Sequence, residues 1–189
     1  MKSKKMVLMG LFLFIGASIL GVNSSLASPM NASESTVQNK SKNDGEIIAT
    51  LIAVNKQEIA AAGEALKISN NPEVKQYAEM LKKQHTQNLN KTLVLSQKTN
   101  IAPVESAKVK LLQKKGAKEL KTLSSLKGKN FDKAYIKAMI KGHTEVLHMF
   151  DNEFLNNVSN SSLKQLLLKT RPHIKAHLEE AEKIQKSLN

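Results

Sequence analysis

The sequence predicts an all-α fold, a four-helix bundle of two antiparallel hairpins joined by a crossover that contains an extra helix. After Asp44 the apolar residues recur at helical spacing, and no stretch alternates with the period of two that is typical of a strand. Turn residues are few and fall between the periodic stretches. Four of the helices are roughly 25 residues long, about 37 Å each, which fits one bundle around one core.

Recognisable capping residues mark where two of the expected helices begin. Asn71 is a favourable N-cap and Pro72 suits the first helical position, while Asn130 is the expected N-cap of the fourth helix. Short turns near residues 70–71 and 159–160 make the helices of each hairpin antiparallel neighbours. The five helices are expected at about residues 45–69, 72–98, 104–126, 131–157 and 162–188.

The first residues are typical of a secretory signal peptide, assigned to residues 1–27. A basic start, "MKSKK", precedes an apolar run over residues 6–20, and "SLA" offers small residues at a cleavage site after Ala27. The apolar run is short for a membrane span, so no transmembrane span is expected in the mature protein. The chain has no cysteine, which excludes a lipoprotein anchor, disulfides and cysteine ligands. The protein is therefore expected to be exported to the periplasm or cell envelope.

Two regions follow the signal peptide. Residues 28–44 are polar and without periodicity, which predicts a flexible leader. Residues 45–189 carry all of the helical periodicity and are expected to form one helical bundle domain around a single core.

The charge of the chain is strongly positive and comes almost entirely from lysine. The formal net charge is +13, and removal of Lys2, Lys4 and Lys5 with the signal peptide lowers it by three. Arg171 is the only arginine and aromatic residues make up 4% of the chain, so the forked and stacking contacts of nucleic-acid binding are scarce. Export also separates the protein from nucleic acid. An anionic envelope surface is the expected partner of the lysine-rich faces.

Each of the four long helices carries one titratable residue on its apolar stripe. At about 100° per residue, Glu58 falls within the stripe of the first helix and His85 near the centre of the second. His143 and His177 belong to the stripes of the helices at 131–157 and 162–188. Counted from each turn, the two members of a hairpin lie at one depth to within about 3 Å. Whether the two hairpins align depends on the crossover, which the sequence leaves open.

One carboxylate and three imidazoles at a single level would form a metal site in the bundle core. These groups are the usual ligands of zinc, copper or iron, so Glu58, His85, His143 and His177 are the candidate ligands. The alternative is a set of buried histidines that hydrogen-bond to carbonyls or neighbours, with Glu58 and His85 as a buried ion pair. The sequence leaves both interpretations open.

The remaining candidates are weaker. Glu145 and His148 have the Glu-x-x-His spacing of di-iron bundles, but both lie far from the apolar stripe and are expected on a solvated face. His173 lies at the edge of its stripe, at the rim of the site, where it could support a ligand. One inward carboxylate is too few for ferritin-type oxidase chemistry. With no nucleophile–His–acid set and no phosphate-binding glycine loop, an enzyme ranks below the two binding functions.

Three segments carry a family resemblance. Residues 71–88, "NPEVKQYAEMLKKQHTQN", 131–154, "FDKAYIKAMIKGHTEVLHMFDNEF", and 171–184, "RPHIKAHLEEAEKI", together resemble the bacterial exported family called domain of unknown function 4142. This family is also described as a predicted outer-membrane protein and is regarded as ferritin-like. The resemblance covers about residues 45–188 and implies a ferritin-like four-helix bundle in the periplasm or envelope.

The resemblance also bears on the candidate site. The family's histidine positions fall on His85, His143 and His177, and its acidic position falls on Glu58. The family commonly has aspartate directly before the first histidine, whereas Gln84 stands there in this chain. No activity follows from the family. The sequence therefore predicts an exported bundle that binds a transition-metal ion for storage, buffering or stress protection, or alternatively a metal-free module that binds an anionic envelope surface.

Overall fold

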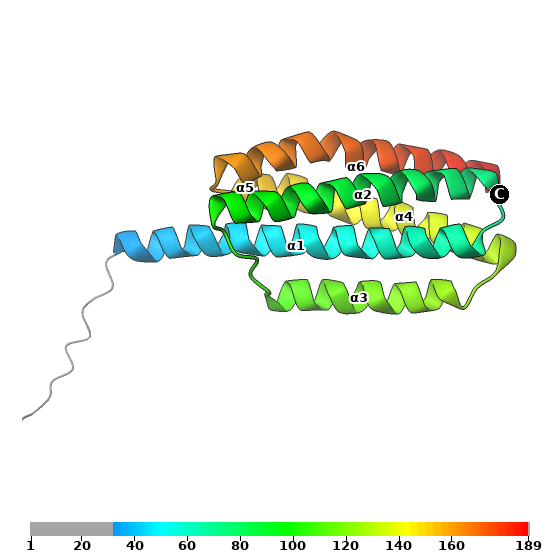
Figure 1. Ribbon diagram of the computed structural model, residues 1–189, viewed down its shortest axis with the longest axis horizontal. Coiled ribbons are helices and arrows are strands. Elements are labelled where there is room, and N and C mark those ends of the chain that lie inside the picture. Colours follow the sequence, from blue (N-terminus) through cyan, green and yellow to red (C-terminus); the bar gives the residue numbers. More distant parts are fainter. Residues whose placement is uncertain (1–31, 189) are drawn as a thin grey trace, which may run out of the picture. The chain divides into compact units, whose positions relative to one another are not determined.

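The computed structural model describes residues 32–188, and all of its regular structure is helical (Figure 1). The all-α prediction is confirmed for these residues, while the predicted signal peptide at 1–27 lies outside them. The order of elements is α1 (Ala32–Ile68), α2 (Pro72–Thr99), α3 (Ala107–Ser124), α4 (Gly128–Met149), the π-helical segment η1 (Phe150–Phe154), α5 (Leu155–Asn157) and α6 (Ser161–Leu188).

The first helix starts earlier than predicted. α1 begins at Ala32, so residues 32–44 are helical and the predicted flexible leader over 28–44 is wrong for this part. The stretch contains no proline or glycine to stop a helix, and its polarity only prevents burial: residues 38–43 are exposed. Asp44 is therefore inside a helix, and its carboxylate accepts hydrogen bonds from the backbone N–H groups of Ser159 (2.8 Å) and Asn160 (2.9 Å).

The other helix ends lie within three residues of the predicted ones, and the largest differences are at the starts of α3 and α4. The Asn71 side chain caps α2 as expected, accepting hydrogen bonds from the backbone N–H groups of Glu73 and Val74. Asn130 is not the N-cap of α4, because that helix begins two residues earlier, at Gly128. The φ of Gly128 is +54°, a left-handed conformation that glycine adopts without strain, and it turns the chain into the helix before Asn130 is reached.

The long helices pack in pairs along their length. α1 packs along α2, and α4 packs along α6, while α3 lies against α1 and α4 (Figure 1). The contact between α2 and α6 is less extensive than the contact within either pair. This separation matters for the site, because it leaves a cleft between α2 and α6 that is lined by residues of all four long helices.

The hydrophobic core is divided into two main clusters. One surrounds Tyr77, Phe131 and Tyr135, and the other surrounds Phe150 and Leu167. The two clusters share no buried residue. Between them lie polar side chains from four helices: Asn55, His85, His143 and His177 are buried, and Glu58 is half-buried with its Oε2 removed from solvent. Burying polar groups at the centre of a bundle costs free energy unless they find partners, so this layer is the candidate site.

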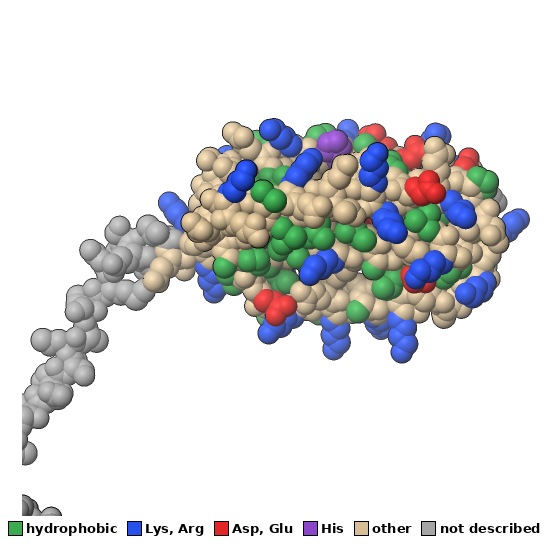
Figure 2. All heavy atoms as spheres, in the orientation of Figure 1, with side chains coloured by type: hydrophobic (Ala, Val, Ile, Leu, Met, Phe, Trp, Pro, Cys, Tyr) green, Lys and Arg blue, Asp and Glu red, His purple; other side chains and the backbone are tan. Residues whose placement is uncertain are grey.

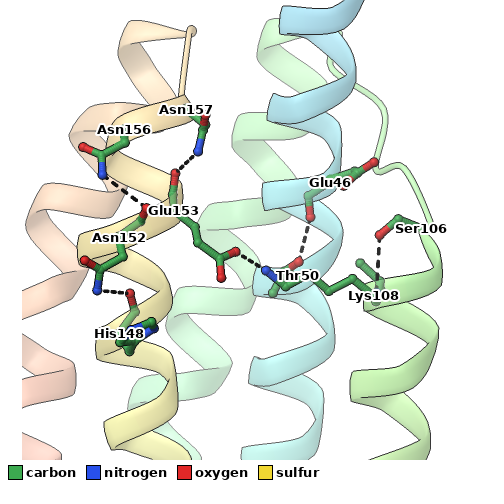
Figure 3. A network of polar contacts seen from close by, with 10 residues as sticks. Glu46, Thr50, Ser106, Lys108, His148, Asn152, Glu153, Asn156 and Asn157 are labelled. Atoms are coloured by element: carbon green, nitrogen blue, oxygen red, sulfur yellow. Dashed lines mark hydrogen bonds and ion pairs between the residues drawn. The ribbon is translucent and has the colours of Figure 1, made fainter.

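A π-helical turn shapes the end of α4. It brings Phe150 and Phe154 into the core together, with ring centroids 5.4 Å apart. The wider turn alters the pattern of backbone hydrogen bonds in this part of the helix. Side-chain amides of asparagines donate hydrogen bonds to backbone carbonyl oxygens here: Asn152 to His148 O (3.1 Å) and Asn157 to Glu153 O (2.7 Å) (Figure 3). The Glu153 side chain also pairs with Lys108, which ties η1 to α3.

Gly45 provides a test of the packing around the start of the bundle. A Cβ at this position would lie 2.6 Å from Val104 Cγ2 and 2.7 Å from the backbone oxygen of Ala102. Gly45→Ala is therefore expected to lower the free energy of unfolding by about 1–3 kcal/mol, measured by urea denaturation.

Gly63 on the same helix is the matched control. A Cβ there has nothing within 4 Å. Gly63→Ala is expected to raise stability by about 0.5–1 kcal/mol through helix propensity alone. Equal effects of the two substitutions would show that the contact between Gly45 and the segment after α2 is unimportant.

Candidate metal centre

Three histidines from three helices meet in the polar layer. His85 on α2, His143 on α4 and His177 on α6 are all buried, with exposures of 6%, 2% and 4%. One ring nitrogen of each lies within 4.8 Å of the others. The ring centroids are 5.3 Å apart for His85–His177 and His143–His177, and 5.9 Å apart for His85–His143. α2, α4 and α6 are thus aligned in depth at these residues, an alignment that the sequence left open.

Each ring is held by a hydrogen bond through its other nitrogen. His85 Nδ1 lies 2.9 Å from Asn55 Oδ1, and His143 Nδ1 lies 2.8 Å from the backbone oxygen of Met139. His177 Nε2 lies 3.0 Å from Gln84 Oε1. All three partners are oxygen acceptors, so these ring nitrogens carry the protons and donate.

The tautomers leave three nitrogens without a hydrogen bond. His85 Nε2, His143 Nε2 and His177 Nδ1 are buried and have no partner within the described residues. In a neutral imidazole the nitrogen opposite the donor is an acceptor with a free lone pair. Each such buried acceptor costs about 1–3 kcal/mol if it stays unsatisfied. Three clustered imidazoles, each with one such acceptor and with the other ring nitrogen hydrogen-bonded, could hold a transition-metal ion.

Burial sets the protonation of the histidines. The pKa of His177 is lowered to about 3, mainly by desolvation and to a smaller extent by the neighbouring His143 and His173. Desolvation is also the main reason that the pKa of His85 lies well below its ordinary value, followed by the proximity of His143 and His177. Both rings are therefore neutral at physiological pH, and a neutral imidazole is the form that binds a metal.

Glu58 lies beside the triad and outside the group of nitrogens that approach one another within 4.8 Å. Its Oε2 is buried without a hydrogen-bond partner. The pKa of the Glu58 carboxyl group is raised above its ordinary value, because the effect of burial exceeds the opposing effect of the nearby His143. The alternative of a Glu58–His85 ion pair is not what the structure shows, because His85 bonds to Asn55 and no ion pair joins the two side chains among the described residues.

Two supporting residues were missed by the sequence analysis. Asn55 precedes Glu58 by one helical turn, and its amide is oriented by donation from Nδ2 to Leu51 O at 2.7 Å. Gln84 directly precedes His85, and its side-chain oxygen holds His177. A buried Asn in an apolar stripe is a signal that could have identified Asn55, since polar core residues need a partner. No signal in this single sequence indicated that Gln84 reaches across to α6.

The other predicted residues lie at the surface. His173 is exposed and lines the mouth of the cleft, and no hydrogen bond connects it to the triad among the described residues. Glu145 and His148 are exposed, as expected for a solvated face. Neither contributes a ligand atom to the cluster of buried nitrogens.

Comparisons with known proteins identify a family and agree with an all-helical fold. A family profile described as "Domain of unknown function (DUF4142)" matches residues 28–184. A DUF305 protein from Streptomyces coelicolor, described as secreted, has a similar structure, with a TM-score of 0.66 and 14% identity over 77% of this chain and 93% of that one.

A DUF305 fragment from Deinococcus radiodurans is also similar, with a TM-score of 0.68 and 14% identity over 77% of this chain and 96% of that one. At this identity the likeness shows the fold alone. The comparison with curated proteins gives no match. Among the described residues, no helix is both long enough and apolar enough to cross a membrane.

Proposed function

The chain belongs to the family described as domain of unknown function (DUF4142), and we propose that it is an exported, ferritin-like bundle of two helical hairpins that binds one transition-metal ion. The ligands are His85, His143 and His177, with Glu58 as the fourth group. The observation that carries the proposal is the set of three partnerless ring nitrogens that converge in the core.

The chemistry of the donor set favours Zn²⁺ or Cu²⁺ over iron. Imidazole suits both ions, and Cu²⁺ binds a given nitrogen site more tightly than the other first-row divalent ions do. Iron sites in four-helix bundles use several carboxylates, whereas Glu58 is the one carboxylate here. Bound cation would keep the Glu58 carboxyl ionised, which offsets the effect of its burial.

The proposed role is buffering or protection against metal stress in the periplasm or envelope. A single triad takes up one ion per chain, which fits stoichiometric buffering better than bulk storage. The described chain offers no nucleophile next to the triad, and its one nearby carboxyl group, that of Glu58, has its Oε2 removed from solvent. A binding function therefore explains the site better than catalysis does.

The proposal is tested by metal analysis of protein expressed without a histidine tag, followed by calorimetric titration with Zn²⁺ and Cu²⁺. One ion per chain is expected, and the variant that combines His85→Asn, His143→Asn and His177→Asn should bind none at this site. Glu58→Gln tests the proposed fourth ligand apart from the triad. Weaker binding of metal that still reaches one ion per chain would support Glu58 as that ligand. Unchanged stoichiometry in the triple variant would refute the site.

Asn55 gives a prediction about the support of the site. Asn55→Ala removes the acceptor of His85 Nδ1–H and leaves a buried donor unpaired, which is expected to cost about 1–3 kcal/mol of stability. Metal affinity should fall about 10–100-fold because the ring loses its orientation. Urea denaturation and calorimetry measure the two effects. Asn90→Ala, on the exposed surface of α2, is the control and should change neither.

A second function, binding to an anionic envelope surface, is favoured by α3. This helix has one acidic residue, Glu119, and six exposed lysines: Lys108, Lys110, Lys114, Lys115, Lys118 and Lys121. Figure 2 shows basic side chains along the edge of the protein where α3 lies. Association with liposomes should require anionic lipid and weaken between low and physiological salt, because exposed charges are screened. Binding that is independent of salt would contradict an electrostatic contact.

A further inference from the structure

The space between α2 and α6 extends well beyond the histidine triad. The cleft has a volume of about 1230 Å³ and is lined by α1, α2, α4, η1 and α6. Its lining on α6 runs from Ser162 to His177, and 15 residues of helix correspond to about 22 Å. One metal ion occupies only a small part of such a space, which is of the size that holds a small organic molecule.

The inner wall of the cleft is apolar. Aliphatic and aromatic side chains from α1, α4, η1 and α6 line it between the triad and the connection before α6. They are Leu51, Val54, Val146, Met149, Phe150, Phe154, Leu166 and Ile174. A hydrocarbon body in contact with this wall would be removed from water, which is favourable in proportion to the area buried.

The mouth of the cleft is cationic. Lys83 and Lys91 on α2 and Lys169 on α6 line it, and none of them forms an ion pair in the part of the chain that the structure describes. Glu58 is the one acidic residue among the lining residues, and its Oε2 is buried at the triad end. The rim is therefore complementary to an anionic group and repels a second cationic one.

The two sides of the mouth are held in register. Thr170 donates a hydrogen bond to Asn88 Oδ1 across the cleft at 3.3 Å, next to Lys169 on one side and three residues before Lys91 on the other. Lys91 and Lys169 thus lie at about the same level on facing helices. The bridge also joins α2 to α6 at the mouth.

We propose that this cleft binds an amphipathic carboxylate, with its hydrocarbon body along the apolar wall and its carboxylate between the lysines of the rim. The occupant is an aliphatic monocarboxylate of fatty-acid type. This inference goes beyond metal binding, because the histidine triad takes no part in it. The apolar wall binds the hydrocarbon chain, and the rim lysines bind the carboxylate.

The test is calorimetric titration of the protein, expressed from the full sequence, with decanoate, decanol and decyltrimethylammonium below their aggregation concentrations. Saturable binding of decanoate is expected, with weaker binding of decanol and the weakest binding of the cation. The triple variant Lys83→Gln, Lys91→Gln and Lys169→Gln should lose about tenfold in affinity for decanoate. The charge-matched variant Lys110→Gln, Lys114→Gln and Lys121→Gln, on the exposed face of α3, should bind like the wild type.

Two further outcomes keep the inference separate from metal binding. Wild-type protein stripped of metal with a chelator should retain decanoate binding, because the apolar wall and the rim lysines hold the ligand without a metal ion. Val146→Trp, which fills the wall, should weaken decanoate binding, and circular dichroism shows whether the variant is folded. Equal affinity for decanoate and decyltrimethylammonium, or no binding of decanoate, would overturn the proposal. An equal loss in both lysine variants would do so as well, because it would indicate adsorption to surface charge.

Discussion

Replacing His177 by alanine is expected to abolish the stabilisation that Zn²⁺ or Cu²⁺ gives to the wild-type protein. A ligand that binds only the folded state raises the free energy of unfolding by about 4 kcal/mol at a thousandfold excess over its dissociation constant. Without His177 Nδ1, one of three converging lone pairs is lost, and a buried site with two imidazoles no longer holds the ion. Thermal unfolding of the wild type and the variant, with and without metal, measures the difference.

His173→Ala is the matched control, because it removes a histidine from the same helix one turn away. His173 is exposed and does not contact the triad through a hydrogen bond, so the variant should keep the full metal-induced stabilisation. In the absence of metal, His177→Ala should cost about 1–3 kcal/mol, since Gln84 loses its partner. Equal stabilisation by metal in all three proteins would show that the triad is not a metal site.

Acid is expected to destabilise the metal-free protein strongly between about pH 6.5 and pH 3. In the unfolded chain a histidine takes up a proton near pH 6.5, whereas burial lowers the pKa of folded His177 to about 3. The unfolded state therefore binds more protons in this window, and the free energy of unfolding falls as the pH falls. Each such histidine contributes about 1.4 kcal/mol per pH unit, and His85, whose pKa is also lowered, acts in the same direction.

Urea denaturation at pH 7 and pH 5, in the presence of a chelator, checks this expectation. His177→Gln removes one titrating group, so the loss of stability between the two pH values should shrink by about 2 kcal/mol relative to the wild type. His148→Gln changes an exposed histidine outside the triad and should leave the loss unchanged. An identical pH dependence in the wild type and His177→Gln would mean that His177 is not held neutral in the folded protein.

The sequence by itself determined the helical class, most helix boundaries and the inward orientation of three histidines. These properties follow from the 3.6-residue period, which places one face of each helix in the core whatever its neighbours are. Asn71 caps α2 through hydrogen bonds to residues two and three positions later, so its role could be predicted from the local sequence. The start of α1 was misplaced because the residues before Asp44 are polar and carry no apolar period that would reveal a helix.

Only the tertiary structure decided how those residues are used. The alignment of His85 with His143 and His177 depends on how the segment with α3 carries the chain from α2 to α4, and no local pattern encodes that distance. The ring tautomers depend on Asn55, Gln84 and the Met139 carbonyl, two of which lie on other helices than the histidine they hold. The cleft likewise exists because α2 and α6 pack less closely than the helices of each pair, a property of the assembled helices that neither sequence segment carries alone.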